Sequence, residues 1–276
     1  MRVRLFGNHS KLHCGCAAVW RSMHVLAVAK GWRVAGRGED YDALIVNGEG
    51  SMHHSGKKFH EKMTLLRNAI EAGKDAYLIN SVWQENSNEY DDVLRRLAGI
   101  SVREIHSRDD LSARHGIVPR VNIDLAFFAP LDRSLWYRRY FGADVATDFW
   151  VANANDWGAC DDVAGGMPRV TLSKRTWGNL VASLRTAGLL VTGRQHAVYA
   201  ASRARLPFAA AESNTHKIGG LIATSGVDIP FARTVDELPE VVQRVRRERH
   251  RFLEFFRWIE AQSAATAMPA PGERWA

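Results

Sequence analysis

Short apolar runs alternate with amphipathic stretches along the first half of the chain. Five runs predict strands, at residues 3–6, 43–46, 76–79, 100–102 and 121–123. Apolar side chains recur at three- and four-residue steps between them, which predicts helices around residues 15–30, 59–72 and 90–98. Strands separated by helices are typical of βαβ units, so we expect a parallel sheet with helices packed against it.

The pattern stops at residues 129–147, an irregular stretch rich in Arg, Tyr and Asp, and then restarts. Strands are predicted in the second half at residues 149–152, 169–172, 189–192 and 207–210. Helices are predicted there at residues 177–187, 195–204 and 216–224. The second half is therefore expected to be a smaller α/β unit of the same style, with the irregular stretch as the connection.

Residues 235–262 predict one long C-terminal helix, because apolar side chains recur on one side and arginines gather toward the other. The residues that follow hold Pro269 and Pro271 among small side chains, which predicts a flexible tail. The predicted organisation is an N-terminal Rossmann-like domain at 1–130, a smaller one at 131–235, the helix at 236–262 and the tail at 263–276.

The composition of the 276-residue chain is that of a globular protein, with 46% hydrophobic and 24% charged residues. The sequence lacks an apolar leader and a run long enough to span a bilayer, and its three cysteines do not suggest a disulfide framework. We therefore expect a cytoplasmic protein. The net charge of +7 indicates an anionic partner without identifying it.

Polar side chains follow the predicted strands, where parallel sheets bind their ligands. They include Asn8, Glu49, Asn80, Arg103 and the pair Arg194 and His196. Turn chemistry alone does not readily place polar residues after so many strands, so this pattern favours an enzyme.

Glu49 stands between Gly48 and Gly50, two residues that permit close backbone approach and a positive φ angle. The motif fits a functional carboxylate, and it fits a tight turn with a solvated glutamate equally well.

Arg194 and His196 open a predicted helix, whose first N–H groups and dipole favour an anion. Arginine adds bidentate recognition of phosphate or carboxylate, and histidine suits proton transfer near neutral pH, so we favour a functional site. Lys217 begins the next helix, where a cation is unfavourable unless an anion is present. On the residues alone, a surface lysine is the preferred interpretation.

Other site types have less support. The spacing of His13, Cys14 and Cys16 matches no standard zinc arrangement, so no metal site is predicted. The glycine-rich signatures of ATP and dinucleotide binding are absent, and so is the nucleophile elbow of serine hydrolases.

Several motifs, in order along the chain, resemble those of the polysaccharide pyruvyl transferase family. They are DALIVNGEGSMHH at 42–54, LHCGCA at 12–17, LINSVWQ at 78–84, SVREIHS at 101–107, and GRQHA at 193–197 with Pro207 and Lys217 downstream. The ordered set covers residues 3 to 225. The resemblance implies an α/β fold of two Rossmann-like halves facing across a cleft, which is a GT-B-like fold.

The resemblance also implies a reaction, in which phosphoenolpyruvate gives its pyruvyl group to a saccharide as a ketal during cell-surface polysaccharide biosynthesis. His196, Glu49 and Arg194 would be catalytic, with the acid and base roles of His196 and Glu49 interchangeable. Substrate-binding residues would be Arg103, Lys217, Asn8, His13, Gly48, Gly50 and Asn80. Phosphoenolpyruvate is a substrate, and no metal or other cofactor is expected.

Two alternatives stay open. One is a GT-B-like glycosyltransferase with a CMP-sugar donor of the sialyl or Kdo type. The other is a basic nucleic-acid-binding protein, which we disfavour because its basic residues are scattered along the sequence. The expected partner is a saccharide acceptor rather than a nucleic acid. If the acceptor is lipid-linked, the basic helix near 244–251 would rest on the inner membrane face.

Overall fold

The computed structural model describes residues 1–7, 13–36, 38–131, 147–151, 167, 170–173, 175–270 and 272–275, with the backbone alone at 147–151. The chain divides into two compact units. Unit 1 comprises residues 1–9, 20–125 and 262–276, and unit 2 comprises residues 10–19 and 126–261. The change at 125/126 lies near the predicted boundary at 130/131. A simple division of the sequence does not predict two of the segments. Residues 10–19 belong to unit 2, and residues 262–276 belong to unit 1.

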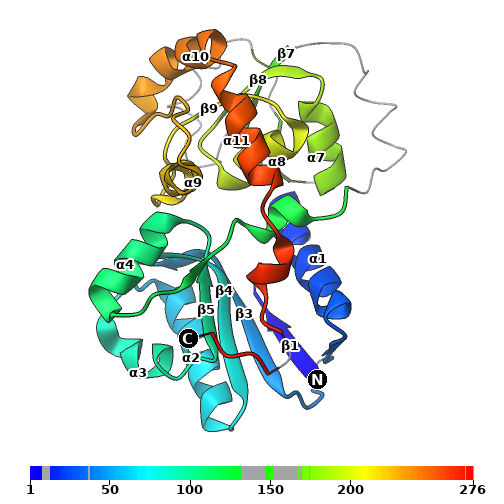
Figure 1. Cartoon of the computed structure of the whole chain (residues 1–276), viewed down its shortest axis with the longest axis vertical. Coiled ribbons are helices and arrows are strands. Elements are labelled where there is room, and N and C mark those ends of the chain that lie inside the picture. Colours follow the sequence, from blue (N-terminus) through cyan, green and yellow to red (C-terminus); the bar gives the residue numbers. More distant parts are fainter. Residues whose placement is uncertain are drawn as a thin grey trace. The chain divides into compact units, whose positions relative to one another are not determined.

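Unit 1 contains a six-stranded sheet in which all neighbouring strands are parallel, in the order β2-β1-β3-β4-β5-β6 (Figure 1). The strands are β1 (Arg2–Phe6), β2 (Arg33–Val34), β3 (Ala43–His53), β4 (Asp75–Gln84), β5 (Gly99–Val102) and β6 (Arg120–Val121). The sheet grows in both directions from the β1–β3 pair, which is the doubly wound arrangement. The predicted α/β class and parallel sheet are therefore confirmed.

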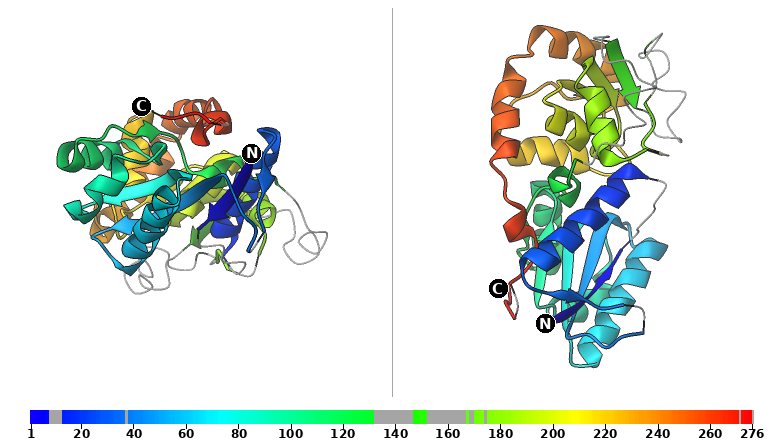
Figure 2. Two further views of the ribbon diagram at one scale, coloured as in Figure 1. Left: turned by 90° about the horizontal axis from the view of Figure 1, so that it is seen from below. Right: turned by 90° about the vertical axis from the view of Figure 1, so that its right-hand side faces the viewer.

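Helices cover this sheet on both faces (Figure 2). They are α1 (Cys14–Ala29), α2 (Lys57–Glu71), α3 (Asp91–Leu94) and α4 (Ile105–His115). Leu44 and Val46 of β3 pack in one cluster with Phe59 and Met63 of α2, whereas Ile45 points to the other face. Because right-handed crossovers lead from β1 to β2 and from β3 to β4 in opposite directions, α1 and α2 lie on opposite faces.

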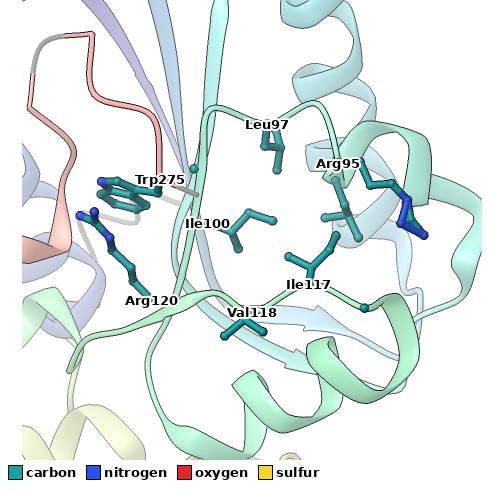
Figure 3. A pocket seen from close by; sticks show the side chains of 10 residues that line it. Arg95, Leu97, Ile100, Ile117, Val118, Arg120 and Trp275 are labelled. Carbon is teal, nitrogen blue, oxygen red and sulfur yellow. The ribbon is translucent and has the colours of Figure 1, made fainter.

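The tail of the chain is packed against unit 1, so the prediction of a flexible tail is wrong for its described residues. Trp275 is 8% exposed, and its backbone N–H donates to the carbonyl oxygen of Ala98 at 2.7 Å. Its ring lies under the guanidinium of Arg120, 4.6 Å away, and borders a pocket of about 380 Å³ (Figure 3). The Tyr77 hydroxyl donates to the carbonyl oxygen of Glu273 at 2.7 Å. Composition suggested disorder, but a buried tryptophan and these hydrogen bonds outweigh it.

Unit 2 contains a three-stranded parallel sheet in the order β7-β8-β9. Its strands are β7 (Thr147–Val151), β8 (Ala187–Thr192) and β9 (Phe208–Ala210), and its helices include α7 (Trp177–Leu184), α8 (Gln195–Ala204) and α9 (Lys217–Ser225). The helix predicted at 195–204 is confirmed at those residues. The predicted strand at 169–172 is wrong for its described residues, because only Ser173 pairs there, in an isolated bridge with His13.

The predicted long C-terminal helix is two helices, α10 (Leu238–Arg247) and α11 (Arg251–Glu260). The break lies at residues 248–250, where Glu248 ends α10 and forms ion pairs with Arg244 and Arg251. Arg249 donates to the carbonyl oxygen of Gly188, and Arg251 forms an ion pair with Asp228. The turn lets the apolar faces of both helices pack on this small unit. One straight helix of the same number of residues would extend beyond it.

No helix among the described residues is long and apolar enough to cross a membrane.

Candidate functional sites in the two units

Three of the predicted site residues of unit 2 lie around the first turn of α8. Arg194 is the N-cap residue of this helix, and His196 follows in its first turn. His13, at the start of α1, faces His196 with a distance of 5.3 Å between the ring centroids. The structure therefore brings together His13, Arg194 and His196, residues more than 180 positions apart in the sequence.

Local backbone contacts place these side chains. The Thr192 hydroxyl at the end of β8 accepts from the N–H of Arg194 at 3.0 Å, which fixes the start of α8. The N–H of Cys14 donates to the carbonyl oxygen of Leu172 at 2.8 Å, which anchors the start of α1. Gly15 lies against the ring of His196, with no room for a side chain between them.

The His13 imidazole is held in its neutral form at neutral pH. The pKa of His13 is lowered to about 4, chiefly by burial and then by the nearby charges of His196 and Arg194. Its Nδ1 accepts from the N–H of Cys16 at 3.3 Å, so hydrogen-bond geometry assigns the proton to Nε2. The site is electropositive, and it combines a guanidinium, a neutral imidazole donor and the N–H groups of a helix start, which suits an anion.

The start of α9 is filled by a carboxylate of the chain itself. Glu212 accepts hydrogen bonds from the N–H groups of Ser213, Ile218 and Gly219, at 3.0–3.1 Å. Burial nevertheless raises the pKa of Glu212 above its ordinary value. Lys217 donates to Oδ1 of Asn214 at 2.6 Å, and its charge favours the ionised form of Glu212. The anion next to Lys217 is thus Glu212, and substrate binding by Lys217 stays a prediction.

Glu49 of unit 1 lies inside β3 (Ala43–His53), which continues past its predicted end at residue 46. It stands at a strained irregularity of this strand, which we call the Glu49 turn. It adopts a left-handed φ of 57°, as does Asn80 on the neighbouring strand with φ of 54°. Strand register also shifts at this level, between Glu49 and Met52 in one pair and between Leu78 and Ser81 in the next. Non-glycine residues held in this conformation are found mostly where a functional site requires them.

Gly48 is required by packing, because a Cβ atom there would lie 2.6 Å from Cβ of Ser81. Glu49 and Ser51 line a pocket of about 320 Å³, together with Phe6, Gly7, Lys58, Glu61 and Lys62. Gly50 adjoins the pocket in sequence and is half-buried.

A chain of buried polar groups supports Glu49. Oε1 of Glu49 accepts from Nδ2 of Asn47 at 3.2 Å, and Oδ1 of Asn47 accepts from Nδ2 of Asn80 at 2.9 Å. The carbonyl oxygen of Asn80 accepts from Nε of Arg103 at 2.8 Å, and Nη1 of Arg103 lies 2.6 Å from Asp124. Asn80 is 3% exposed, so it contributes to the framework of this turn rather than to a ligand surface.

Arg103 forms a buried ion pair. Its side chain is 1% exposed and its partner Asp124 is fully buried. A ligand phosphate would have to replace Asp124 inside the protein, which is costly for both buried charges. In this structure Arg103 is bound to Asp124 and to the backbone of Asn80, and direct substrate binding by Arg103 stays a prediction. Asn8, another predicted substrate-binding residue, lies outside the described residues.

Sequence reasoning missed Lys62, Asn47 and Glu212. Asn47 ends the same apolar run that led to Glu49, and this position was the signal available in the sequence. Lys62 lies mid-helix among charged residues, and no pattern distinguishes it from exposed Lys57 and Lys58. Among the described residues, no group of three or more His, Cys, Asp and Glu side chains is placed to hold a metal ion.

The fold is similar to several solved structures. An uncharacterised protein from Klebsiella pneumoniae has a TM-score of 0.58 at 13% identity, covering 80% of this chain and 87% of that one. A candidate UDP-N-acetylglucosamine 2-epimerase from Listeria monocytogenes has a TM-score of 0.59 at 10% identity, covering 96% and 93%. A UGT transferase from Siraitia grosvenorii, in complex with UDP, has a TM-score of 0.50 at 10% identity, covering 94% of each chain.

No protein-family model matches the chain, and no curated protein matches it by sequence. At these identities the structural similarities establish the fold, which is GT-B-like and built of Rossmann-like units. The fold expected from the sequence motifs is therefore confirmed.

Proposed function

We propose that the chain is a transferase acting on a saccharide, and that the group it transfers is the pyruvyl group of phosphoenolpyruvate. The observation that carries the proposal is the cluster of His13, Arg194 and His196 at the first turn of α8. A small donor with a phosphate and a carboxylate needs an electropositive site of this kind. The ordered motifs and the GT-B-like fold support the same class of enzyme.

The reaction assigns a task to each group. The C2 atom of phosphoenolpyruvate forms bonds to two sugar oxygens while its bond to the phosphate oxygen breaks. One hydroxyl proton ends on the methylene carbon, which becomes a methyl group, and the other leaves with the phosphate. Arg194 and the N–H groups of α8 would bind the departing phosphate, and His196 would deliver a proton to the methylene or the phosphate. For Glu49 of unit 1, accepting a hydroxyl proton from a sugar or holding the sugar stays a prediction.

The neutral state of His13 fits this assignment. A neutral imidazole with its proton on Nε2 donates a hydrogen bond without adding a charge, so it can bind a phosphate oxygen across neutral pH. Glu212 adds a second argument. Since its carboxylate already occupies the start of α9, we assign the donor anion to the electropositive start of α8.

A nucleotide-sugar donor is the second candidate. It is favoured by the fold similarity to a UGT transferase solved with UDP. Under this alternative the cluster at α8 would bind a donor phosphate, with a CMP-sugar as the donor expected from the sequence.

Thermal stabilisation by candidate donors tests the proposal, because a ligand that binds the folded state raises its melting temperature. Phosphoenolpyruvate should stabilise the protein, and CMP, UDP and CMP-sugars should not. The His196→Ala and Arg194→Ala variants should keep their melting temperature and lose this shift. Arg205→Ala is the matched control, because it removes an exposed arginine that pairs with Glu260 in the same unit.

Phosphate release from phosphoenolpyruvate with candidate saccharides, followed by ³¹P NMR, tests the chemistry. If only nucleotides or nucleotide sugars stabilise the protein, the proposal of pyruvyl transfer is wrong and glycosyl transfer is the supported function.

A further inference from the structure

Lys62 is a buried lysine next to Glu49 with no role in the functions considered so far. It belongs to the second turn of α2, and it is only 2% exposed. Its ammonium donates to the carbonyl oxygen of Gly48 at 2.6 Å and to the hydroxyl of Ser51 at 2.8 Å. Gly48 precedes Glu49 and Ser51 follows it, so this one ammonium binds the chain on both sides of Glu49.

The turn needs such support because its backbone is strained. Glu49 has a left-handed φ of 57°, and the register between β3 and β4 shifts directly after it. The Ser51 hydroxyl also donates to the Gly48 carbonyl oxygen at 3.1 Å, so Lys62, Ser51 and Gly48 form a closed set of hydrogen bonds. Strained conformations persist only where their surroundings hold them in place.

The pocket beside the turn has a balanced charge. It is lined by the two carboxylates of Glu49 and Glu61 and by the two ammonium groups of Lys58 and Lys62. Lys58 and Glu61 pair with each other at 2.7 Å and are both exposed. Phe6 adds an aromatic side chain, and Ser51 adds a hydroxyl. Since these opposite charges balance one another, the pocket offers no net charge to an ionic ligand, and a neutral ring with several hydroxyls and an apolar face fits its walls.

We propose that Lys62 is a positioning residue that locks the Glu49 turn, and that the pocket it lines takes a neutral sugar ring rather than an acidic one. The lock follows from the hydrogen bonds alone. The sugar specificity deepens the proposed function and rests on it.

The charge of Lys62 adds an attraction for Glu49 to these hydrogen bonds. The pKa of Lys62 is lowered to about 8, chiefly by burial, against the opposing effect of the Glu49 carboxylate. Smaller contributions to this value come from other neighbours. Arg103 and Lys58 lower the pKa, and Glu61 raises it. Above pH 8 the amine keeps two N–H donors but loses its attraction for Glu49. The affinity of the pocket for a sugar should therefore fall above this pH.

Amide hydrogen exchange at residues 48–53 tests the lock without any ligand. Lys62→Met removes the ammonium and keeps a buried apolar stem, whereas Lys58→Met removes an exposed ammonium from the same pocket and helix. Lys62→Met should speed exchange in this segment by about tenfold, the loss expected for a hydrogen bond to a charged group. Lys58→Met should leave it unchanged. Equal rates in the two variants would overturn the lock.

Ser51→Ala keeps the test decisive if Lys62→Met does not fold. This variant removes one acceptor of the lysine from a half-buried position. It should speed exchange in the same segment and leave the rest of unit 1 protected. An unchanged segment in Ser51→Ala would also overturn the lock.

Sugar binding tests the specificity, with methyl glucoside, methyl galactoside and glucuronate as probes in saturation-transfer NMR and calorimetry. The neutral glycosides should bind better than glucuronate. Their affinity should fall above pH 8, and this fall should be absent in Lys62→Met. Tighter binding of glucuronate, or no binding of any sugar, would overturn the neutral pocket. Sugar binding that depends on Glu49 and Lys62, without phosphate release from phosphoenolpyruvate, would instead refute pyruvyl transfer and leave the role of Lys62 standing.

Discussion

Gly15 of α1 and His196 of α8 lie so close that a Cβ atom on residue 15 would be 2.6 Å from Nδ1 and 2.7 Å from Cβ of His196. The smallest side chain therefore cannot be added without moving the imidazole. Gly15→Ala should displace His196 and abolish stabilisation by phosphoenolpyruvate.

The melting temperature of Gly15→Ala should also fall, because Cβ of His196 moves only with the backbone of α8, so rotation of the imidazole alone does not relieve the clash. Gly178→Ala is less suitable as a control, since Gly178 is buried within α7. Gly36→Ala at an exposed position of unit 1 serves better, since the nearest atom would lie 3.6 Å from the added Cβ, and it should keep full ligand stabilisation. Unimpaired binding in Gly15→Ala would show that the position of His196 does not matter for the anion.

His13 should make folding less favourable in mild acid. Its pKa falls from 6.5 to about 4 in the folded protein, so between these pH values the unfolded chain binds more protons than the folded one. The free energy of unfolding should therefore decrease as the pH falls from 6.5 to 4, by at most about 3 kcal/mol for a shift of this size. Solvent screening at this half-buried site reduces the effect.

Urea unfolding of the wild type and of His13→Gln, between pH 4 and 7, measures this contribution. The difference between the two curves should change with pH over that range and stay constant above it. Parallel curves would mean that His13 is protonated as easily in the folded protein as in the unfolded chain.

Lys62 should change the free energy of unfolding at alkaline pH. Its pKa falls from 10.5 to about 8, so between these values the folded protein has released a proton that the unfolded chain still holds. The contribution of Lys62 to the free energy of unfolding should increase from pH 8 to pH 10.5, by about 3 kcal/mol at most. Guanidinium unfolding of the wild type against Lys62→Met over this range checks the sign. A wild type that loses stability relative to Lys62→Met as the pH rises would contradict it.

Trp275 should contribute strongly to the stability of unit 1. Replacing a buried tryptophan with alanine costs about 3–5 kcal/mol, and Trp275→Ala should approach the lower end because the residue lies in a terminal segment. Gly99 lies against the indole, since a Cβ atom there would be 2.6 Å from Cε3 of Trp275. Gly99→Ala should be destabilising in the wild type and nearly neutral in Trp275→Ala.

This double-mutant cycle, measured by denaturant unfolding, isolates the contact between the two residues. Additive effects would mean that the indole does not pack on Gly99 in solution.

Much of the fold follows from local sequence patterns. The alternation of apolar runs with helical periodicity was enough to predict the parallel sheet of unit 1 and the helix at 195–204. Helix α4 was not predicted, because three of its positions are buried as Ser107, Leu111 and His115, two of them polar. Its start is fixed by Glu104, which accepts from the N–H of Ser107, and such a cap is hard to recognise without the fold.

The sequence also placed polar groups at strand ends, and from this it identified Glu49, Arg194 and His196 as candidates. For Arg194 and His196 this placement is confirmed, because β8 ends at Thr192. For Glu49 and Asn80 it is wrong, because β3 and β4 continue to His53 and Gln84 and hold both residues inside the strands. What the sequence could not reveal is which candidates face a ligand. Arg103 and Arg194 both follow strands, yet Arg103 is paired with Asp124 in the interior and Arg194 begins a helix at a half-buried site.

The sequence by itself determined the α/β class, the parallel sheets and the glycine-flanked carboxylate, because periodicity and turn chemistry act over a few residues. Only the tertiary structure decided that His13 meets His196, that Lys62 grips the Glu49 turn, that Glu212 fills the start of α9 and that the tail packs on Gly99. Each of these contacts joins segments whose closeness depends on how helices and strands pack, and neither propensity nor spacing encodes that packing in a form readable from one chain.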